Sequence, residues 1–168
     1  MAFTVRLATL AEAQKIAKLG ADVFTITFGH SVPPHKLQAY IEERYTPPAV
    51  TTLLEDPEKR TYVATNEDCR ILGFATMAYE TNKACIEDVQ STIELQRVYV
   101  DTAVLGKGLS FRLARTIEKQ AKEEGFQNIW LSVWEEHGSG HKVYQKWGYN
   151  QVGYDDFTVG TLCREIIL

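Results

Sequence analysis

The sequence is poor in the features that define several large classes of protein. Its three cysteines, Cys69, Cys85 and Cys163, are odd in number and widely spaced, which argues against a disulfide framework or a cysteine zinc site. No apolar run approaches a membrane-spanning length, and residues 1–9 lack the pattern of a signal or transit peptide. There is no basic excess, since the net charge is -4. We therefore expect a cytoplasmic protein without a membrane or nucleic-acid partner.

The remaining composition is that of an ordinary globular protein. The 168 residues are 45% hydrophobic and 24% charged, which suits one domain with a substantial core. The sequence contains no internal repeat, low-complexity tract or linker, so a single domain over residues 1–168 is expected.

The first half of the sequence predicts a strand, several helices and a hairpin. Thr9 and Glu12 form a capping-box pattern at the start of a helix that runs towards Phe24. Two proline pairs suit the starts of further helices, so residues 24–56 are interpreted as short helices and loops, either a lid over a pocket or a plain helical cover. The other expected elements are a strand at 3–7 and a hairpin of strands at 60–64 and 71–79.

The second half predicts two parallel strands that flank a helix. The expected strand at 94–100 leads through a short connection to a helix with a buried stripe, which ends at Gly125. The apolar run at 129–134 predicts a strand parallel to the first, because a helix connects the two. A helix over 138–147 and an antiparallel pair at 149–152 and 161–168 are expected to complete the sheet.

The connection before the central helix has the pattern of an anion site. It reads Leu105-Gly106-Lys107-Gly108-Leu109-Ser110. The first N–H groups of a helix lack partners within the helix, and the helix dipole adds positive potential there. Glycines lack a Cβ, so a phosphate can approach the backbone closely. A tight turn without a ligand would have the same pattern, and the interpretation therefore depends on the flanking sequence.

A second motif lies directly after the strand at 129–134. It runs His137-Gly-Ser-Gly-His-Lys-Val-Tyr144-Gln-Lys146-Trp-Gly148-Tyr149. The glycine-rich loop followed by this second motif resembles the GNAT superfamily of acyl-CoA N-acyltransferases. In that family the loop has the pattern Gln/Arg-x-x-Gly-x-Gly/Ala, on which Leu105, Gly108 and Ser110 align. The run Thr27 to His30, followed by Pro33-Pro34, is similar to its branch of PaiA-type spermidine/spermine acetyltransferases.

The resemblance implies a fold, a co-substrate and the residues that bind it. The implied fold is α/β (α+β), one GNAT-like domain with a mixed, mostly antiparallel central sheet, helices on both faces, and splayed strands at 94–100 and 129–134. The implied co-substrate is acetyl-CoA. Leu105, Ser110 and His137 depart from the family's usual residues, but the loop's task uses main-chain N–H groups. The residues implied to surround coenzyme A are Val98, Tyr99, Val100, Leu105, Gly106, Lys107, Gly108, Leu109, Ser110, His137, Tyr144 and Lys146.

Amine acylation by a thioester needs a polarised carbonyl, a neutral amine and a proton for the departing thiolate. The resemblance assigns that proton to the phenol of Tyr144, whose alternative role is a packed aromatic beside Val143 and Trp147. Glu94 is the carboxylate of the central strand best placed to accept the amine proton, through water. Its alternative role is that of a half-exposed strand residue.

The acceptor side is less defined by the sequence. Candidate substrate residues are Phe28, Tyr40, Trp134 and Glu135, although a tryptophan on a strand is often a core residue and a glutamate at a strand end is often only solvated. The histidines at 137 and 141 share a helical face, but no clear third ligand accompanies them, so we expect no metal.

The sequence thus predicts an acetyltransferase that moves the acetyl group of acetyl-CoA to a primary amine in a ternary complex. The acceptor is a small-molecule amine, such as a polyamine, or a peptide amine. The alternatives are an acyl-CoA-binding module without catalysis and a histidine metal protein. The sequence leaves the oligomeric state undecided, and a homodimer stays open.

Overall fold

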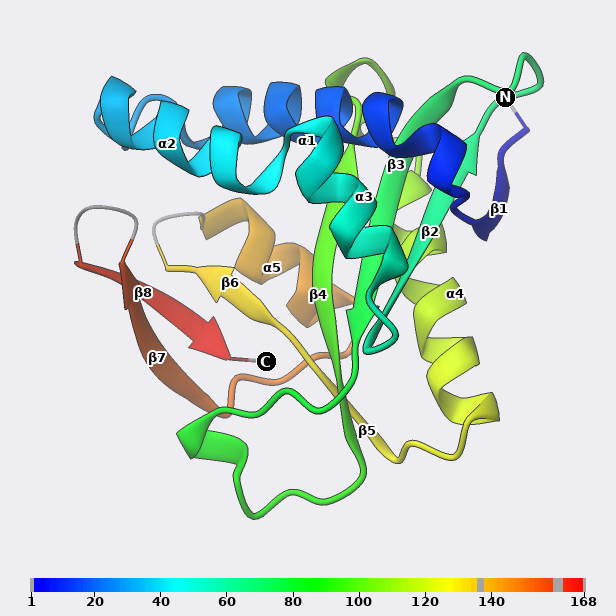
Figure 1. Ribbon diagram of the computed structural model, residues 1–168. Helices are drawn as coiled ribbons and strands as arrows, with labels where there is room; N and C mark the ends of the chain where they lie inside the picture. Colours follow the sequence, from blue (N-terminus) through cyan, green and yellow to red (C-terminus); the bar gives the residue numbers. More distant parts are fainter. Residues whose placement is uncertain (1, 136–137, 159–161, 168) are drawn as a thin grey trace.

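The structure, a computed structural model, describes residues 2–135, 138–158 and 162–167 (Figure 1). Its helices are α1 (Ala13–Phe28), α2 (Pro34–Arg44), α3 (Pro47–Glu55), α4 (Leu109–Glu123) and α5 (Gly138–Lys146). Its strands are β1 (Thr4–Leu7), β2 (Lys59–Thr65), β3 (Ile71–Ala78), β4 (Thr92–Val100), β5 (Asn128–Trp130), β6 (Ser132–Trp134), β7 (Gly153–Thr158) and β8 (Leu162–Ile167).

The strands form two sheets. Five strands in the order β1-β2-β3-β4-β5 make the larger sheet, in which every pair is antiparallel except β4 and β5. The smaller sheet has the order β6-β8-β7 and is antiparallel throughout. The predicted hairpin is confirmed as β2 and β3, and the predicted parallel pair as β4 and β5.

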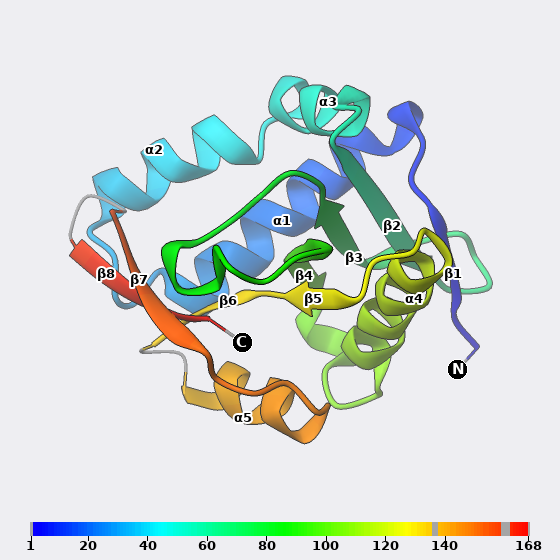
Figure 2. The ribbon, with the colours of Figure 1, turned by 90° about the horizontal axis from the view of Figure 1, so that it is seen from below.

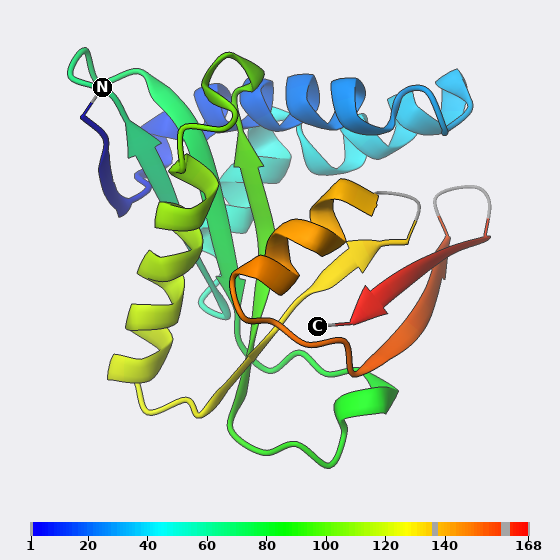
Figure 3. The ribbon, with the colours of Figure 1, turned by 180° about the vertical axis from the view of Figure 1, so that it is seen from behind.

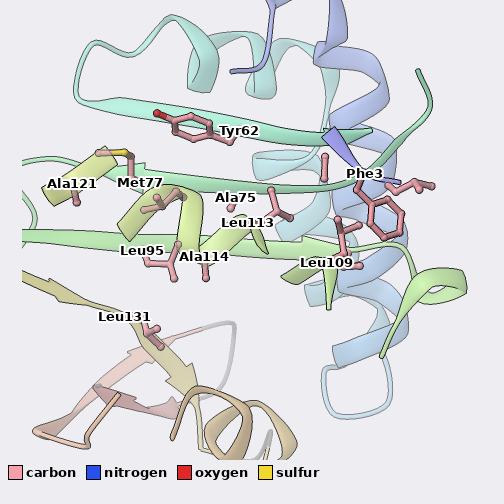
Figure 4. Close-up of a cluster of buried hydrophobic side chains, with 14 of the residues drawn as sticks. Phe3, Tyr62, Ala75, Met77, Leu95, Leu109, Leu113, Ala114, Ala121 and Leu131 are labelled. Carbon is pink, nitrogen blue, oxygen red and sulfur yellow. The ribbon is translucent and has the colours of Figure 1, made fainter. Parts of the chain in front are cut away.

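Helices cover both faces of the larger sheet. Figure 1 shows α1, α2 and α3 on one side, and the view from behind in Figure 3 shows α4 and α5 on the other. Each face has its own core. The core under α4 contains its buried stripe, Leu109, Leu113, Ala114, Ile117 and Ala121, packed on sheet residues such as Met77 and Leu95 (Figure 4). The core under α1 and α3 includes Ile16, Phe24, Val50, Val63 and Phe74.

Local sequence explains where the helices begin and end. The capping box is present, because Glu12 accepts from the backbone N–H of Thr9 at 2.9 Å. Proline opens both α2 and α3, where its missing N–H costs nothing. Gly125 follows α4 with a φ of +90°, and the N–H of Phe126 donates to Ala121 in the pattern of a left-handed helix end. No helix in the described ranges is both long and apolar enough to cross a membrane.

Three boundaries differ from the sequence prediction. Helix α1 extends to Phe28, one turn beyond the predicted end near Phe24, because Phe28 packs on Phe24 and on Trp134 at centroid distances of 4.7 and 4.5 Å. The single strand predicted at 129–134 is divided into β5 and β6 at Leu131.

The strand predicted at 149–152 was also placed too early. The chain there is irregular, and the strand is β7, at 153–158. Strands β7 and β8 do not close the larger sheet as predicted, since β8 pairs with β6 on one side and with β7 on the other (Figure 2). The prediction missed this because the pattern of residues does not show which sheet a strand joins. The segment ending at Trp134 and the later strands could equally well have extended the larger sheet.

Candidate active site

Strands β4 and β6 diverge in the middle of the molecule. β4 pairs with β5 only over Thr92–Glu94, and the chain then leaves β4 to pair as β6 with β8 (Figures 1 and 3). From Leu95 to Val100, β4 has its described strand partner on the β3 side alone. The splay implied by the resemblance is therefore present.

The open edge of β4 exposes main-chain hydrogen-bond donors. The backbone N–H of Asp101 donates a hydrogen bond to the carbonyl oxygen of Leu72, on the β3 side, at 2.8 Å. Because successive N–H groups of a strand alternate in direction, those of Val98 and Val100 face away from β3, towards β6. These two N–H groups are placed to bind a ligand that enters between the strands.

Two cavities meet at this opening. The α5-side cavity, of about 410 Å³, lies between β4, β6, α5 and the start of α4. The α2-side cavity, of about 390 Å³, lies between β4, β6, α1 and α2. The residues that line both are Phe28, Gln96, Arg97, Tyr99, Ser132 and Trp134. A molecule in one cavity can therefore react with a molecule in the other across the gap between the strands.

A bulge in β4 determines which side chains enter the α2-side cavity. Leu95 lies opposite Met77 and Arg97 lies opposite Thr76, so Gln96 is an extra residue without a partner of its own on β3. The bulge changes the alternation of the strand. As a result Glu94 and Arg97, which are three residues apart, line the same cavity.

The loop before α4 has the geometry of an anion site. Gly106 and Gly108 have φ values of +75° and +76°, in the left-handed region that favours glycine, and a Cβ on either would meet no atom within 4 Å. The first intrahelical bond at this end runs from Arg112 N–H to the carbonyl of Gly108 at 3.1 Å. The N–H groups of Leu109, Ser110 and Phe111 thus remain available at a helix N-terminus.

The predicted loop residues lie around this helix start in different ways. Leu105, which is 62% exposed, and Ser110 line the α5-side cavity. Leu109 has its side chain in the core, at 1% exposure, so only its main chain faces the loop. Lys107 is exposed and lies outside both cavity linings.

Tyr144 lies on α5 and lines the α5-side cavity together with Val98 and Val100. Its ring packs edge-on against Trp147 and Tyr149, at centroid distances of 5.1 and 5.8 Å. Burial raises the pKa of the phenol well above its ordinary value, with a smaller contribution from Tyr99. The phenol is therefore protonated at neutral pH, as a proton donor must be.

Glu94 lies on the other side of the opening, in the α2-side cavity, and is only 9% exposed. One of its carboxylate oxygens accepts a hydrogen bond from Gln96 Nε2 at 3.4 Å. The half-exposed strand position considered from the sequence is wrong, since this carboxylate is buried against a cavity.

Aromatic rings form one wall of the α2-side cavity. Phe28 and Trp134 line both cavities, and Tyr40 lines the α2-side cavity, stacked on Phe24 at 4.4 Å. Of the remaining candidates, Glu135 and Lys146 are exposed and lie outside both cavity linings, while His137 falls outside the described residues.

Sequence reasoning missed several polar residues of the α2-side cavity, namely Arg44, Lys83, Gln96 and Arg97. Only Arg97 had a recognisable signal, since it alternates with Tyr99 on the central strand. Gln96 had none, because the bulge that directs it into the opening cannot be read from the sequence. Within the described ranges, no group of three or more His, Cys, Asp and Glu side chains is arranged to hold a metal ion.

The parted strands, the N–H groups at the open edge of β4 and the helix N-terminus form the arrangement expected for an acyltransferase site. Residues 24–149 match the Acetyltransferase (GNAT) family. The chain therefore belongs to the GNAT family of acetyltransferases, enzymes that take an acyl group from acyl-CoA.

Several known proteins are similar to this chain in fold or in sequence. The PaiA N-acetyltransferase from Thermoplasma acidophilum, solved in complex with coenzyme A, is similar with a TM-score of 0.78 and 16% identity, covering 99% of this chain and 98% of that one. An N-acetyltransferase from Staphylococcus aureus Mu50 has a TM-score of 0.68 and 19% identity, covering 100% and 98%. Streptothricin acetyltransferase from Streptomyces lavendulae is 29% identical over 103 residues, 60% of this chain and only 50% of that protein.

Proposed function

We propose that this protein transfers the acetyl group of acetyl-CoA to a primary amine by direct attack in a ternary complex. The observation that carries the proposal is the meeting of two cavities where β4 and β6 part. The α5-side cavity would hold acetyl-CoA and the α2-side cavity would hold the amine. Acetyl-CoA supplies an activated acyl thioester, and residues of this chain bind it and move protons.

The binding residues act mainly through their main chain. The N–H groups at the start of α4, with Gly106 and Gly108 leaving the approach clear, would bind the pyrophosphate. The N–H groups of Val98 and Val100 would bind the pantetheine arm and the thioester oxygen. Leu105 and Ser110 would contact the coenzyme from the cavity wall.

Two side chains would move protons. Glu94 would accept the proton of the attacking amine, through water, from the α2-side cavity. Tyr144 Oη would donate a proton to the departing sulfur from the α5-side cavity. The two groups line different cavities, Glu94 on the side proposed for the amine and Tyr144 on the side proposed for the thioester. A covalent acyl-enzyme is not part of the proposal, because no cysteine stands in a motif for one.

Phe28, Tyr40 and Trp134 would contact the acceptor. The PaiA-like resemblance makes a polyamine one candidate acceptor, next to other small amines and a peptide amine.

The test is release of free thiol from acetyl-CoA with a panel of amines, comparing the wild type with Tyr144→Phe. We expect turnover of at least one amine, and a drop in kcat of about 100- to 1,000-fold in the variant, the range of general acid catalysis. Tyr62→Phe would serve as a matched control, because it removes a phenol hydroxyl from a buried ring that lines neither cavity. A variant that keeps full turnover would remove Tyr144 as the proton donor. Acetyl-CoA binding without thiol release for any amine would instead favour the non-catalytic module.

A further inference from the structure

Among the described residues, the charged groups of the α2-side cavity are mostly cationic. They are three cations, Arg44, Lys83 and Arg97, and one carboxylate, Glu94. A cavity that receives a cationic polyamine would be expected to show the opposite balance, because opposite charges attract the ligand and like charges repel it.

Two of these cations have anionic partners within the protein. The ammonium of Lys83 forms an ion pair with Asp155. The side chain of Arg44 is 46% exposed, its Nε contacts Glu43 at 2.9 Å, and its guanidinium lies over the ring of Tyr40, 5.7 Å from the centroid. The charges of these two cations are therefore largely balanced.

Arg97 differs from both. Among the described residues none forms a hydrogen bond or ion pair with its guanidinium, which lies over the ring of Tyr45, 5.6 Å from the centroid. The hydroxyl of Tyr45 is already used, since it donates to Tyr99 at 2.7 Å. A partly buried guanidinium with unused donors is costly unless an anion pairs with it. Its planar fork matches the two oxygens of a carboxylate, with which it forms a bidentate pair.

Acceptors for an amino group lie beside this guanidinium. Gln96 Oε1 is buried without a partner in the described part of the chain, and Gln96 Nε2 donates to Glu94. Gln96 and Arg97 are adjacent in the bulge of β4, and both line both cavities. The site therefore presents hydrogen-bond acceptors and a cation next to each other, at the point where the amine would meet the thioester.

We propose that the acceptor is a primary amine with a carboxylate within a few bonds of its amino group, as in an amino acid. Arg97 binds the carboxylate, and Gln96 and Glu94 orient the amino group. The inference rests on the proposed function. It disfavours a polyamine, because a further ammonium group would lie against the guanidinium of Arg97.

The test compares amines that differ only in the carboxylate. Each common amino acid is assayed for thiol release from acetyl-CoA beside its amide and its decarboxylated amine, with spermidine included. The enzymes are the wild type, Arg97→Gln, Arg97→Lys and a control, Arg60→Gln, whose arginine pairs with Glu124 away from both cavities.

We expect the wild type to favour the carboxylate form of its best amine by at least about 10-fold in kcat/KM, and Arg97→Gln to lose about 10- to 100-fold on that form alone. Arg97→Lys should recover part of the loss, and Arg60→Gln should match the wild type on all three forms. The KM for acetyl-CoA should stay within about twofold in every variant. The substitutions at Arg97 remove a contact with the amine and none with acetyl-CoA.

Three results would overturn the inference. If the wild type prefers the amide, the decarboxylated amine or spermidine, the inference of a carboxylate-bearing acceptor is wrong, while the proposed acetylation of an amine still stands. An equal loss on every amine in Arg97→Gln would assign Arg97 to the thioester instead. No turnover with any amine would overturn the proposed function as well. The wild-type preference tests the inference even if the variants fold poorly.

Discussion

Replacement of Gly108 by alanine separates the backbone strain of the loop from its part in coenzyme binding. Gly108 has a φ of +76°, and an added Cβ would meet no atom within 4 Å, so the substitution creates strain but no clash. A residue with a Cβ in the left-handed region costs about 1–2 kcal/mol. At about 2–4 °C per kcal/mol for a chain of this size, the melting temperature should fall by roughly 2–8 °C.

Gly125 provides a matched control at the other end of the same helix. Its φ is +90°, and a Cβ there would also meet nothing within 4 Å. Gly125→Ala should therefore lose a similar amount of stability, measured by calorimetric unfolding. Only Gly108→Ala places a methyl group at the N-terminus of α4, in the open space that a diphosphate would need.

The affinity for coenzyme A should separate the two variants. We expect Gly108→Ala to bind coenzyme A about 10-fold more weakly or worse, about 1.4 kcal/mol, and Gly125→Ala to bind as the wild type does. Isothermal titration at matched temperature and salt measures both. If the two variants bind coenzyme A equally well, the N-terminus of α4 is not the pyrophosphate site, and the assignment of the loop is wrong.

Two further predictions concern the stability of the sheet and of its aromatic layer. The hydroxyls of Thr61 and Thr76 share a buried hydrogen bond of 2.9 Å, so Thr76→Val should cost about 1–3 kcal/mol by leaving the Thr61 hydroxyl unpaired, whereas the double valine variant should recover most of it in urea unfolding. Equal stability of the single and double variants would argue against this pairing. Burial raises the pKa of Tyr99 to about 12, while an unfolded tyrosine titrates near 10. Between those values the unfolded chain binds fewer protons, so stability should fall as pH rises from 10 to 12, by up to about 1.4 kcal/mol per pH unit, and less steeply in Tyr99→Phe.

Much of the architecture was determined by local sequence. The capping box of Thr9 and Glu12, the proline pairs before α2 and α3, and Gly125 after α4 act within a few residues of themselves, so their effects could be predicted. The four-residue repeat from Leu109 to Ala121 likewise indicated which face of α4 is buried. The glycine-rich loop and the Tyr144 motif could be recognised because both are contiguous in the chain.

The acceptor side was decided only by tertiary structure. Whether the segment 129–134 continues along β4 or turns to β8 depends on a partner more than 30 residues away, and no residue in the segment encodes that choice. The bulge at Gln96 depends in the same way on the register between β3 and β4. That one extra residue places Glu94 and Arg97 in a single cavity, whereas strict alternation along the strand would have put them on opposite faces. The two contiguous motifs could therefore be recognised in the sequence, while the set of charged side chains that line the α2-side cavity depends on how the strands pair.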